Sequence, residues 1–182
     1  SPWDRQIVSA IAFLSQFPLG SVSARFRPIG TADMQYHDSY FVVAHFHYVL
    51  VPGAVFALMA GAYYWLPKWT GHMYDERLSK LHFWLSAISV NVLFFPMHFV
   101  GLQGMPRRIP DYALQFADFN RIASVGGFVF GLSQLLFVYI VIKTVRGGAK
   151  ATDRVWEGSH GLEWTVPSPA PYHTFATAPE IR

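Results

Sequence analysis

The chain of 182 residues has no cysteine. It therefore contains no disulfide, zinc–thiolate site, iron–sulfur cluster or thiolate-bound copper, and any metal must be held by His, Asp, Glu or Met. Charge is also scarce, since Asp, Glu, Lys and Arg make up 14% of the residues, where soluble domains carry roughly 25%. The net charge of +3 is too small to indicate a nucleic-acid-binding surface. The first residues lack a basic leader followed by an apolar run, so no signal peptide is predicted.

Apolar residues are abundant instead, because 52% of the chain is hydrophobic and 17% is aromatic. Many of them lie in three uncharged runs, at 39–67, 81–106 and 122–142. Each run is long enough to cross a bilayer, which takes about 20 residues, and a chain in lipid must be helical to satisfy its backbone hydrogen bonds. The sequence therefore predicts an all-α integral membrane protein with three transmembrane helices. Short loops join these helices, so consecutive helices must be antiparallel.

Three regions of the chain differ in composition. Residues 1–35 contain an apolar stretch too short to span a membrane, followed by a basic, turn-like stretch, which indicates an interfacial or disordered arm. Residues 36–145 contain the three spans. Residues 146–182 are rich in Gly and Pro, which favours an extended tail lying against a partner surface. Lys and Arg are nearly balanced between the two sides, with a slight excess that favours a cytoplasmic C-terminus.

Two histidines, His45 and His47, lie inside the first apolar run. Ionisable residues within a membrane are costly, and function is the default interpretation. Residues two apart on an α-helix are about 200° apart around its axis, so these imidazoles face nearly opposite sides and cannot chelate one metal. Two metal centres flanking the helix, such as hemes among aromatic residues, would suit this arrangement. Neutral histidines that hydrogen-bond to neighbouring helices would suit it as well, and for His98 that interpretation is favoured.

Polar residues also lie at the start of the first run and at the end of the second. His37 and Asp38 precede the first run, where they could hold Mg²⁺ or Mn²⁺ together with ligands from elsewhere, or where Asp38 could cap the helix. Arg107 and Arg108 follow the second run. Because the two helices are antiparallel, these arginines lie on the side of the first helix start. They could pair there with the carboxylates of a bound cofactor, or be ordinary interfacial arginines.

Four segments together carry a family resemblance. They are YHDSYFVVAHFHYVL at 36–50, NVLFFPMHFVGLQGMPRR at 91–108, DFNRIASVGGF at 118–128 and LEWTVPSPAPYHTF at 162–175. In this order they closely resemble the C-terminal part of subunit I of the cytochrome c oxidases, in the heme–copper superfamily. Asp38 and Tyr48 resemble the branch that oxidises cytochrome c more than the branch that oxidises quinol. The resemblance implies that the three spans are the last three of a bundle of twelve helices.

The resemblance also implies roles for residues near the first span. His45 would be the catalytic-site residue that ligates the iron of the high-spin heme, where oxygen is reduced. His47 would ligate the iron of the low-spin heme, and Phe46 would lie between the two hemes. His37 and Asp38 would contribute to a site for Mg or Mn. The first span would thus give one ligand to each of two hemes.

The same resemblance implies that Arg107 and Arg108 contact heme propionates. The family's copper beside the high-spin heme takes its ligands from earlier helices, and the second ligand of the low-spin heme also comes from an earlier segment. The segments that carry the copper ligands and the second ligand of the low-spin heme are not present in this sequence, so the copper ligands are absent here. Residues 1–35 resemble none of the family's motifs. We therefore expect a truncated gene, a frameshifted junction or a fragment, and a chain that is inactive alone.

The enzyme implied by the resemblance is a proton-pumping oxidase that reduces O₂ to water with electrons from cytochrome c. Its implied partners are the remaining helices of subunit I, the copper-bearing subunit II, other oxidase subunits, cytochrome c and the lipid bilayer, but no nucleic acid. The implied location is a bacterial inner membrane, which the chain crosses several times. Three alternatives stay open, namely a non-catalytic membrane protein that binds heme, a heme-free helical bundle and a quinol-oxidising relative.

Overall fold

The structure is a computed structural model, and it describes residues 18, 21–22, 25, 29–175 and 177–179. The arm predicted for 1–35 therefore lies largely outside the described residues. Helices and two isolated β-bridges form the regular structure of the described part. In chain order the elements are α2 (Gly30–Tyr36), α3 (Tyr40–Leu50), the π-helical turn η1 (Val51–Val55), α4 (Phe56–Thr70), α5 (Glu76–Leu102), η2 (Leu114–Phe116), α6 (Ala117–Arg146) and η3 (Leu162–Trp164).

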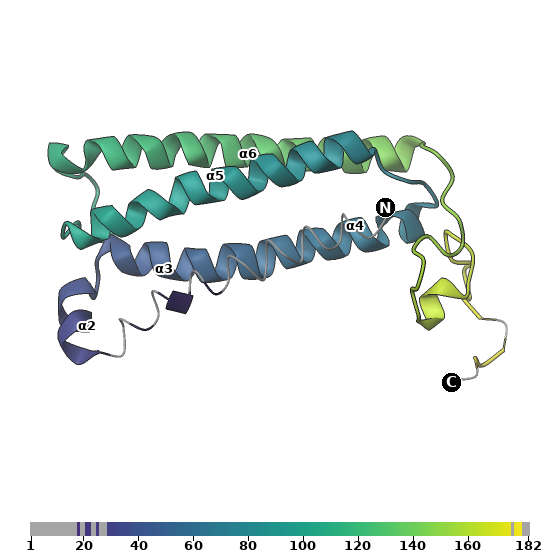
Figure 1. The fold of residues 1–182 in the computed structure, drawn as a ribbon. Helices are drawn as coiled ribbons and strands as arrows, with labels where there is room; N and C mark the ends of the chain where they lie inside the picture. The colour runs from purple at the N-terminus through teal and green to yellow at the C-terminus, as the bar shows by residue number, and fades with distance from the viewer. Residues whose placement is uncertain (1–17, 19–20, 23–24, 26–28, 176, 180–182) are drawn as a thin grey trace.

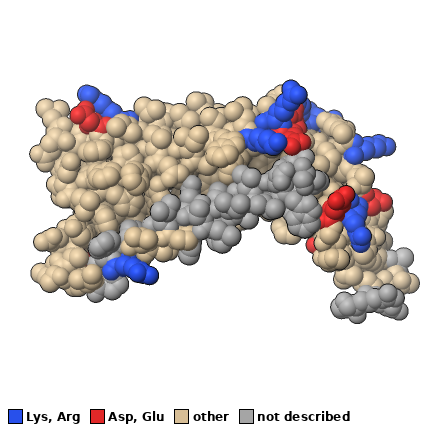
Figure 2. Space-filling view, in the orientation of Figure 1, with Lys and Arg blue, Asp and Glu red and all other residues tan. Residues whose placement is uncertain are grey.

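Three long helical units lie side by side and run antiparallel (Figure 1). They cover Tyr40–Thr70, Glu76–Leu102 and Leu114–Arg146, with 31, 27 and 33 residues, and each is long and apolar enough to cross a membrane. On the described part of the face in Figure 2, a broad band without charged side chains separates charged residues near the two ends. The predicted all-α membrane fold with three spans is therefore confirmed.

The second helix extends beyond its uncharged run because a polar residue caps it. The Asp75 carboxylate accepts hydrogen bonds from the backbone N–H groups of Arg77 at 3.0 Å and Leu78 at 3.2 Å. These bonds satisfy N–H groups that a helix start leaves unpaired, so α5 begins at Glu76 rather than at Leu81. Charged residues that end an apolar run can therefore still belong to its helix.

A π-helical turn interrupts the first span directly after the histidine segment. It covers Val51–Val55 and contains Pro52, which has no N–H to donate and whose ring clashes with the preceding turn. Beyond it α4 diverges from α5 (Figure 1). Aromatic side chains bridge the wider space, where the Phe56 and Phe83 rings meet edge-on with their centroids 6.3 Å apart.

Glycines let the helix backbones touch at two interfaces. A β-carbon added to Gly101 in α5 would lie 2.0 Å from the backbone nitrogen of Phe41 in α3. One added to Gly126 in α6 would lie 2.5 Å from the backbone nitrogen of Leu93 in α5. At Gly131 nothing lies within 4 Å of such an atom. Small residues allow membrane helices to approach closely, and Gly101 and Gly126 serve this purpose here.

The described part of the tail packs against the end of α4 in its own chain. Trp156 is 4% exposed, and its indole N–H donates to the Tyr64 carbonyl at 3.0 Å. The Lys68 ammonium donates to the carbonyl of Asp153 at 3.1 Å and to that of Val166. The composition of the tail predicts contact with a partner surface, whereas the contacts seen here are with the same chain.

Candidate functional site

His45 and His47 lie in α3, which is a regular α-helix from Tyr40 to Leu50. Helical geometry therefore places their side chains about 200° apart around the axis. His45 is buried, with 8% of its surface exposed, and His47 is partly buried. The two rings lie in different surroundings and cannot both ligate one metal.

The His47 ring is held in a defined orientation. Its Nδ1 lies 2.8 Å from the Val43 carbonyl oxygen, and because a carbonyl can only accept, Nδ1 carries the proton. Nε2 then has the lone pair, which is the form of imidazole that binds a metal. The ring stacks on Phe94 of α5, with centroids 4.6 Å apart and an interplanar angle of 11°, and the Phe46 ring centroid lies 4.2 Å away. His47 thus has the tautomer and support that a metal ligand needs.

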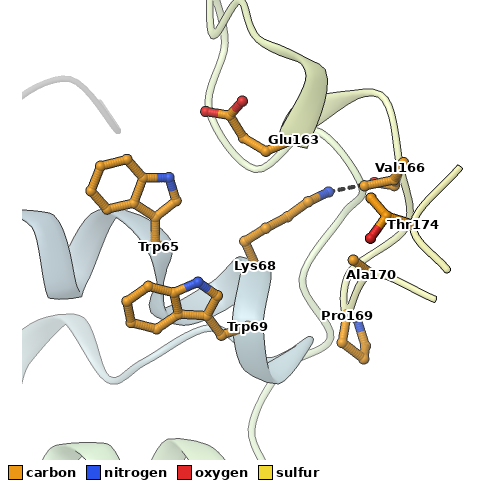
Figure 3. Close-up of a pocket in the computed structure, with 8 residues that line it drawn as sticks. All are labelled: Trp65, Lys68, Trp69, Glu163, Val166, Pro169, Ala170 and Thr174. Atoms are coloured by element: carbon orange, nitrogen blue, oxygen red, sulfur yellow. Dashed lines mark hydrogen bonds between the residues drawn. The ribbon is translucent and has the colours of Figure 1, made fainter. Parts of the chain in front are cut away.

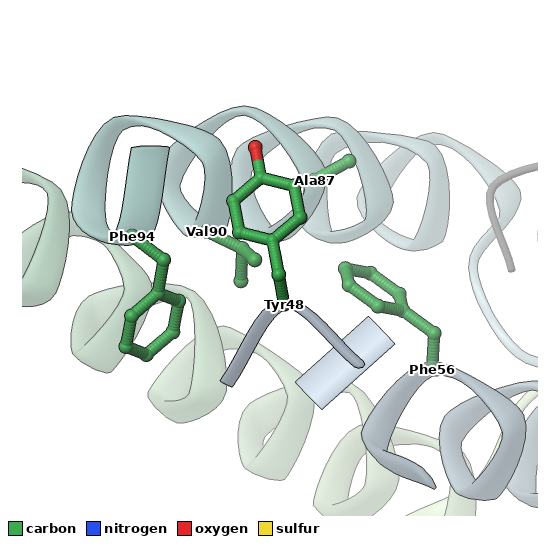
Figure 4. Close-up of a cluster of buried hydrophobic side chains, with 5 residues drawn as sticks. All are labelled: Tyr48, Phe56, Ala87, Val90 and Phe94. Atoms are coloured by element: carbon green, nitrogen blue, oxygen red, sulfur yellow. The ribbon is translucent and has the colours of Figure 1, made fainter. Parts of the chain in front are cut away.

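A buried apolar cluster joins α3 and α4 to α5 beside these histidines. It consists of Tyr48, Phe56, Ala87, Val90 and Phe94 (Figure 4). Each of the five has an exposed fraction of 8% or less. Since Phe94 also stacks on His47, the packing of this cluster supports the orientation of that ring.

Polar contacts accompany the cluster. The Tyr48 hydroxyl donates to the side-chain oxygen of Asn91 on α5. The His98 ring meets the Phe41 and Tyr48 rings edge-on, with centroids 5.6 and 5.4 Å apart, and its Nδ1 lies 3.3 Å from the Phe95 carbonyl oxygen. His98 is therefore packed and hydrogen-bonded, in agreement with the favoured interpretation of the sequence.

An ion pair ties the start of α3 to the loop after α5. Arg107 Nε donates to Asp38 Oδ1 at 2.7 Å, a second guanidinium nitrogen contacts the same oxygen, and the Arg107 backbone N–H donates to the Asp38 carbonyl at 2.8 Å. The hydrogen bond from Arg107 holds the pKa of Asp38 below its usual value, and the charges of Arg107, His37 and Arg108 act in the same direction. The exposed Arg108 and Asp38 both have left-handed backbone, with φ of 63° and 58°, which costs about 1–3 kcal/mol each.

His37 and Asp38 are close together, but they form only part of a metal site. His37 Nε2 lies 3.8 Å from Asp38 Oδ2, and His37 Nδ1 lies 3.7 Å from Asp33 Oδ2. Within the part of the chain that the structure describes, no three His, Asp or Glu side chains are grouped so as to hold a metal ion. Mg²⁺ prefers six oxygen ligands in near-octahedral geometry. A divalent ion here would therefore need ligands from outside these residues.

Two contacts of the site connect distant parts of the sequence and are not predicted by it. Tyr48 and Asn91 are 43 positions apart, and Phe94 reaches His47 across the same interface. The one available signal was Asn91 itself, because a polar side chain inside an apolar run is expected to find a hydrogen-bond partner.

Comparison with known proteins identifies the family of this helical unit. Residues 2–129 match the family model for the cytochrome c and quinol oxidase polypeptide I. The chain belongs to this family. The matched residues include all of α3, α4 and α5. They also include nearly all of 1–35, which the four family-like motifs do not cover, so the family match extends beyond the region that the motifs indicate.

Three relatives named cytochrome c oxidase subunit 1 are similar over nearly the whole chain. The identity is 44% over 173 residues with the protein of Cereibacter sphaeroides, which covers 94% of this chain and 31% of the relative. It is 44% over 185 residues for Yarrowia lipolytica, covering 92% and 35%, and 42% over 175 residues for Bacillus sp. strain PS3, covering 95% and 28%. The chain therefore spans about a third of the length of the curated relatives it matches.

A solved structure described as a heme–copper terminal oxidase dimer shares the fold. It matches 80% of this chain and 27% of that chain with a TM-score of 0.68, at 17% sequence identity. The likeness shows that the arrangement of the three helical units is one that occurs in a heme–copper oxidase.

Proposed function

We propose that the chain forms the C-terminal part of subunit I of a proton-pumping cytochrome c oxidase, with its three spans as the last three of twelve helices. The observation that carries this proposal is the pair His45 and His47 on opposite sides of one regular helix, in a chain of the oxidase polypeptide I family. The complete enzyme reduces O₂ to water with electrons from cytochrome c. Since the chain spans about a third of its relatives, the activity belongs to the complete subunit and not to this chain alone.

In this proposal the two histidines serve different hemes. His45 ligates the iron of the high-spin heme where oxygen is reduced, and His47 ligates the iron of the low-spin heme. When bound, the hemes supply the electron transfer and the oxygen reduction. The chain's own contribution is orientation: the Val43 carbonyl holds the proton on His47 Nδ1, which leaves Nε2 for the metal, and Phe46 packs against the His47 ring. The single tautomer of His47 supports the assignment.

Arg107 and Arg108 pair with heme propionates in this proposal, and His37 and Asp38 contribute to a Mg or Mn site that other ligands complete. Arginine has five N–H donors, and Asp38 engages two of the guanidinium nitrogens of Arg107, so donors remain for a second anion. The Oδ2 atom of Asp38 remains for a cation. The Asp38–Arg107 ion pair at the start of α3 can therefore take part in both sites, with Arg107 binding a propionate and Asp38 binding the divalent ion.

The proposed setting is a bacterial inner membrane with the tail on the cytoplasmic side. Exposed apolar side chains on α6 support contact with lipid, among them Phe128 at 77% and Leu132 at 65% exposure. The proposed protein partners are the remaining helices of subunit I, the copper-bearing subunit II and other oxidase subunits, with cytochrome c as the electron donor. The copper beside the high-spin heme takes its ligands from outside this chain.

The proposal is tested by assembling the chain with the missing two thirds of subunit I. We expect two hemes per assembled subunit and oxygen uptake with reduced cytochrome c, whereas the chain alone should bind little heme and consume no oxygen. A parallel assay with quinol decides between the two electron donors that the family name covers. Oxygen uptake by the chain alone, or uptake by the assembly with quinol and not with cytochrome c, would contradict the proposal.

A further inference from the structure

Two contacts hold the His47 ring, and each removes a different freedom. The hydrogen bond between Nδ1 and the Val43 carbonyl, at 2.8 Å, fixes one atom of the ring. The ring could still tilt about the line that joins Nδ1 to this oxygen. The Phe94 ring opposes such a tilt, because it lies nearly parallel to the imidazole, at an interplanar angle of 11° and a centroid distance of 4.6 Å. The tautomer of His47 is therefore set within α3, whereas the plane of its ring is set from α5.

Phe94 is itself held in place by buried packing. It is 8% exposed and belongs to the apolar cluster with Tyr48 and Ala87 (Figure 4). One turn earlier on α5, the Asn91 amide group donates to the Ala87 carbonyl at 2.7 Å, and its side-chain oxygen accepts from the Tyr48 hydroxyl. Tyr48 directly follows His47 in α3. This hydrogen bond therefore fixes the rotation of α3 against α5 beside the stacked rings.

On the basis of the proposed role of His47 as a heme ligand, we infer that Phe94 is a positioning residue that sets the plane of the His47 imidazole at the low-spin iron. Groups around a metal-ligating histidine orient its ring. The plane of an axial imidazole decides which iron d orbitals its π electrons overlap, and this overlap influences the g-values of a low-spin ferric heme. A stacked aromatic pair favours its orientation by roughly twofold to twelvefold, so loss of the Phe94 ring should let the imidazole plane vary.

The test is electron paramagnetic resonance of the complete oxidase subunit carrying Phe94→Leu, in its oxidised form. We expect the variant to keep two hemes, with low-spin g-values that are shifted and lines that are broadened. The visible absorption of the high-spin heme should match the parent. Phe94→Met is a second variant without a ring and should behave as Phe94→Leu does. Phe94→Tyr keeps the aromatic face and should restore the g-values of the parent.

Two control variants remove aromatic rings elsewhere in the first span. Phe56→Leu removes a ring of the same buried cluster, which meets Phe83 edge-on. Trp69→Leu removes a ring at the end of α4, where it lines a cavity together with Lys68 and Glu163 (Figure 3). Both variants should keep the g-values of the parent, because the Phe94 ring still stacks on the imidazole.

Parent-like g-values in Phe94→Leu, or an equal shift in Phe56→Leu or Phe94→Tyr, would overturn the inference. Loss of the hemes from both Phe94→Leu and Phe94→Met would also overturn it, because Phe94 would then be needed for assembly and not for orientation. His47→Ala distinguishes this inference from the proposed function. If the low-spin signal survives in His47→Ala, the proposed ligand is wrong. If that signal is lost while Phe94→Leu matches the parent, only the role of Phe94 is wrong.

Discussion

Both ends of the three-helix unit hold a cation in place, but with different chemistry. At the start of α3, Arg107 pairs with the Asp38 carboxylate, and these side chains are 24% and 59% exposed. At the end of α4, Lys68 is 5% exposed and donates to two backbone carbonyls of the tail. One cation therefore meets a negative charge near water, and the other meets backbone dipoles away from water.

The difference predicts how each end responds to change. An exposed ion pair contributes little free energy and is weakened by salt and acid. A buried ammonium leaves its partners unsatisfied when it is removed, which is more costly. At the Arg107 end, the larger contribution to the free energy of unfolding must come from the backbone contact of Gly101 with Phe41. At the other end, the larger contribution comes from Lys68 itself.

The largest effect is expected for Gly101→Ala, which tests the contact beneath the Arg107 end. The new methyl group would overlap the α3 backbone, so α3 must move away from α5, at a cost of about 3 kcal/mol in the free energy of unfolding. Unfolding in mixed detergent micelles measures this cost. Gly131→Ala is the control, because its methyl group meets nothing within 4 Å, and a gain of about 1 kcal/mol in helix propensity is expected there. Equal effects of the two substitutions would contradict the close contact.

A smaller effect is expected for Lys68→Met at the other end. The variant leaves two tail carbonyls without their donor, which should weaken the docking of the tail by about 2 kcal/mol. Limited proteolysis measures the result as faster cleavage within the tail, while the three spans stay protected. Lys150→Met, at an exposed position of the tail, should be cleaved at the parent's rate. If Lys68→Met is cleaved no faster than this control, Lys68 is not the anchor.

The smallest effect is expected for Asp38→Asn. Because Arg107 holds the pKa of Asp38 below its usual value, which is about 3.9, the charge of this carboxylate stabilises the fold above that value. This stabilisation is lost as the pH falls through the lower pKa of the folded state. Thermal unfolding should show the parent slightly more stable than the variant at neutral pH, and equal to it in strong acid.

Salt and a second carboxylate give the controls for this prediction. The difference between parent and Asp38→Asn should shrink at about 1 M salt, where screening is strong. Asp118→Asn should change the stability less than Asp38→Asn does, because Asp118 is 92% exposed and lies 3.7 Å from Arg121. A difference for Asp38→Asn that persists in acid would show that the carboxylate acts through shape and not through charge.

The three spans, and the position of Arg107 on the same side as Asp38, could be predicted from the sequence. Uncharged runs in lipid leave helices as the available structure, and antiparallel order brings Arg107 to the side of Asp38, where the two residues are in contact. Helix limits were predicted less well, since α5 begins at Glu76 through the cap provided by Asp75. The consequence of Pro52, a π-helical turn instead of a simple continuation, was not predicted.

The contacts of the tail and of His47 could not be predicted, because they depend on residues that are distant in the sequence. Nothing local in a Gly- and Pro-rich segment indicates that Trp156 will be buried or that its indole will reach Tyr64. In the sequence, Lys68 is the charged residue that ends an apolar run. In the structure, the tail packs over Lys68 and buries it. The placement of His45 and His47 on opposite sides of their helix could be predicted, because it depends only on helical geometry.

We propose that His45 and His47 each ligate the iron of a different heme. The most direct measurement is the heme content of the complete oxidase subunit carrying His45→Ala or His47→Ala, together with its visible absorption and electron paramagnetic resonance spectra. We expect His47→Ala to lose the low-spin signal and keep the high-spin one, and His45→Ala to do the reverse. Loss of the same signal from both variants, or of neither signal, would contradict it.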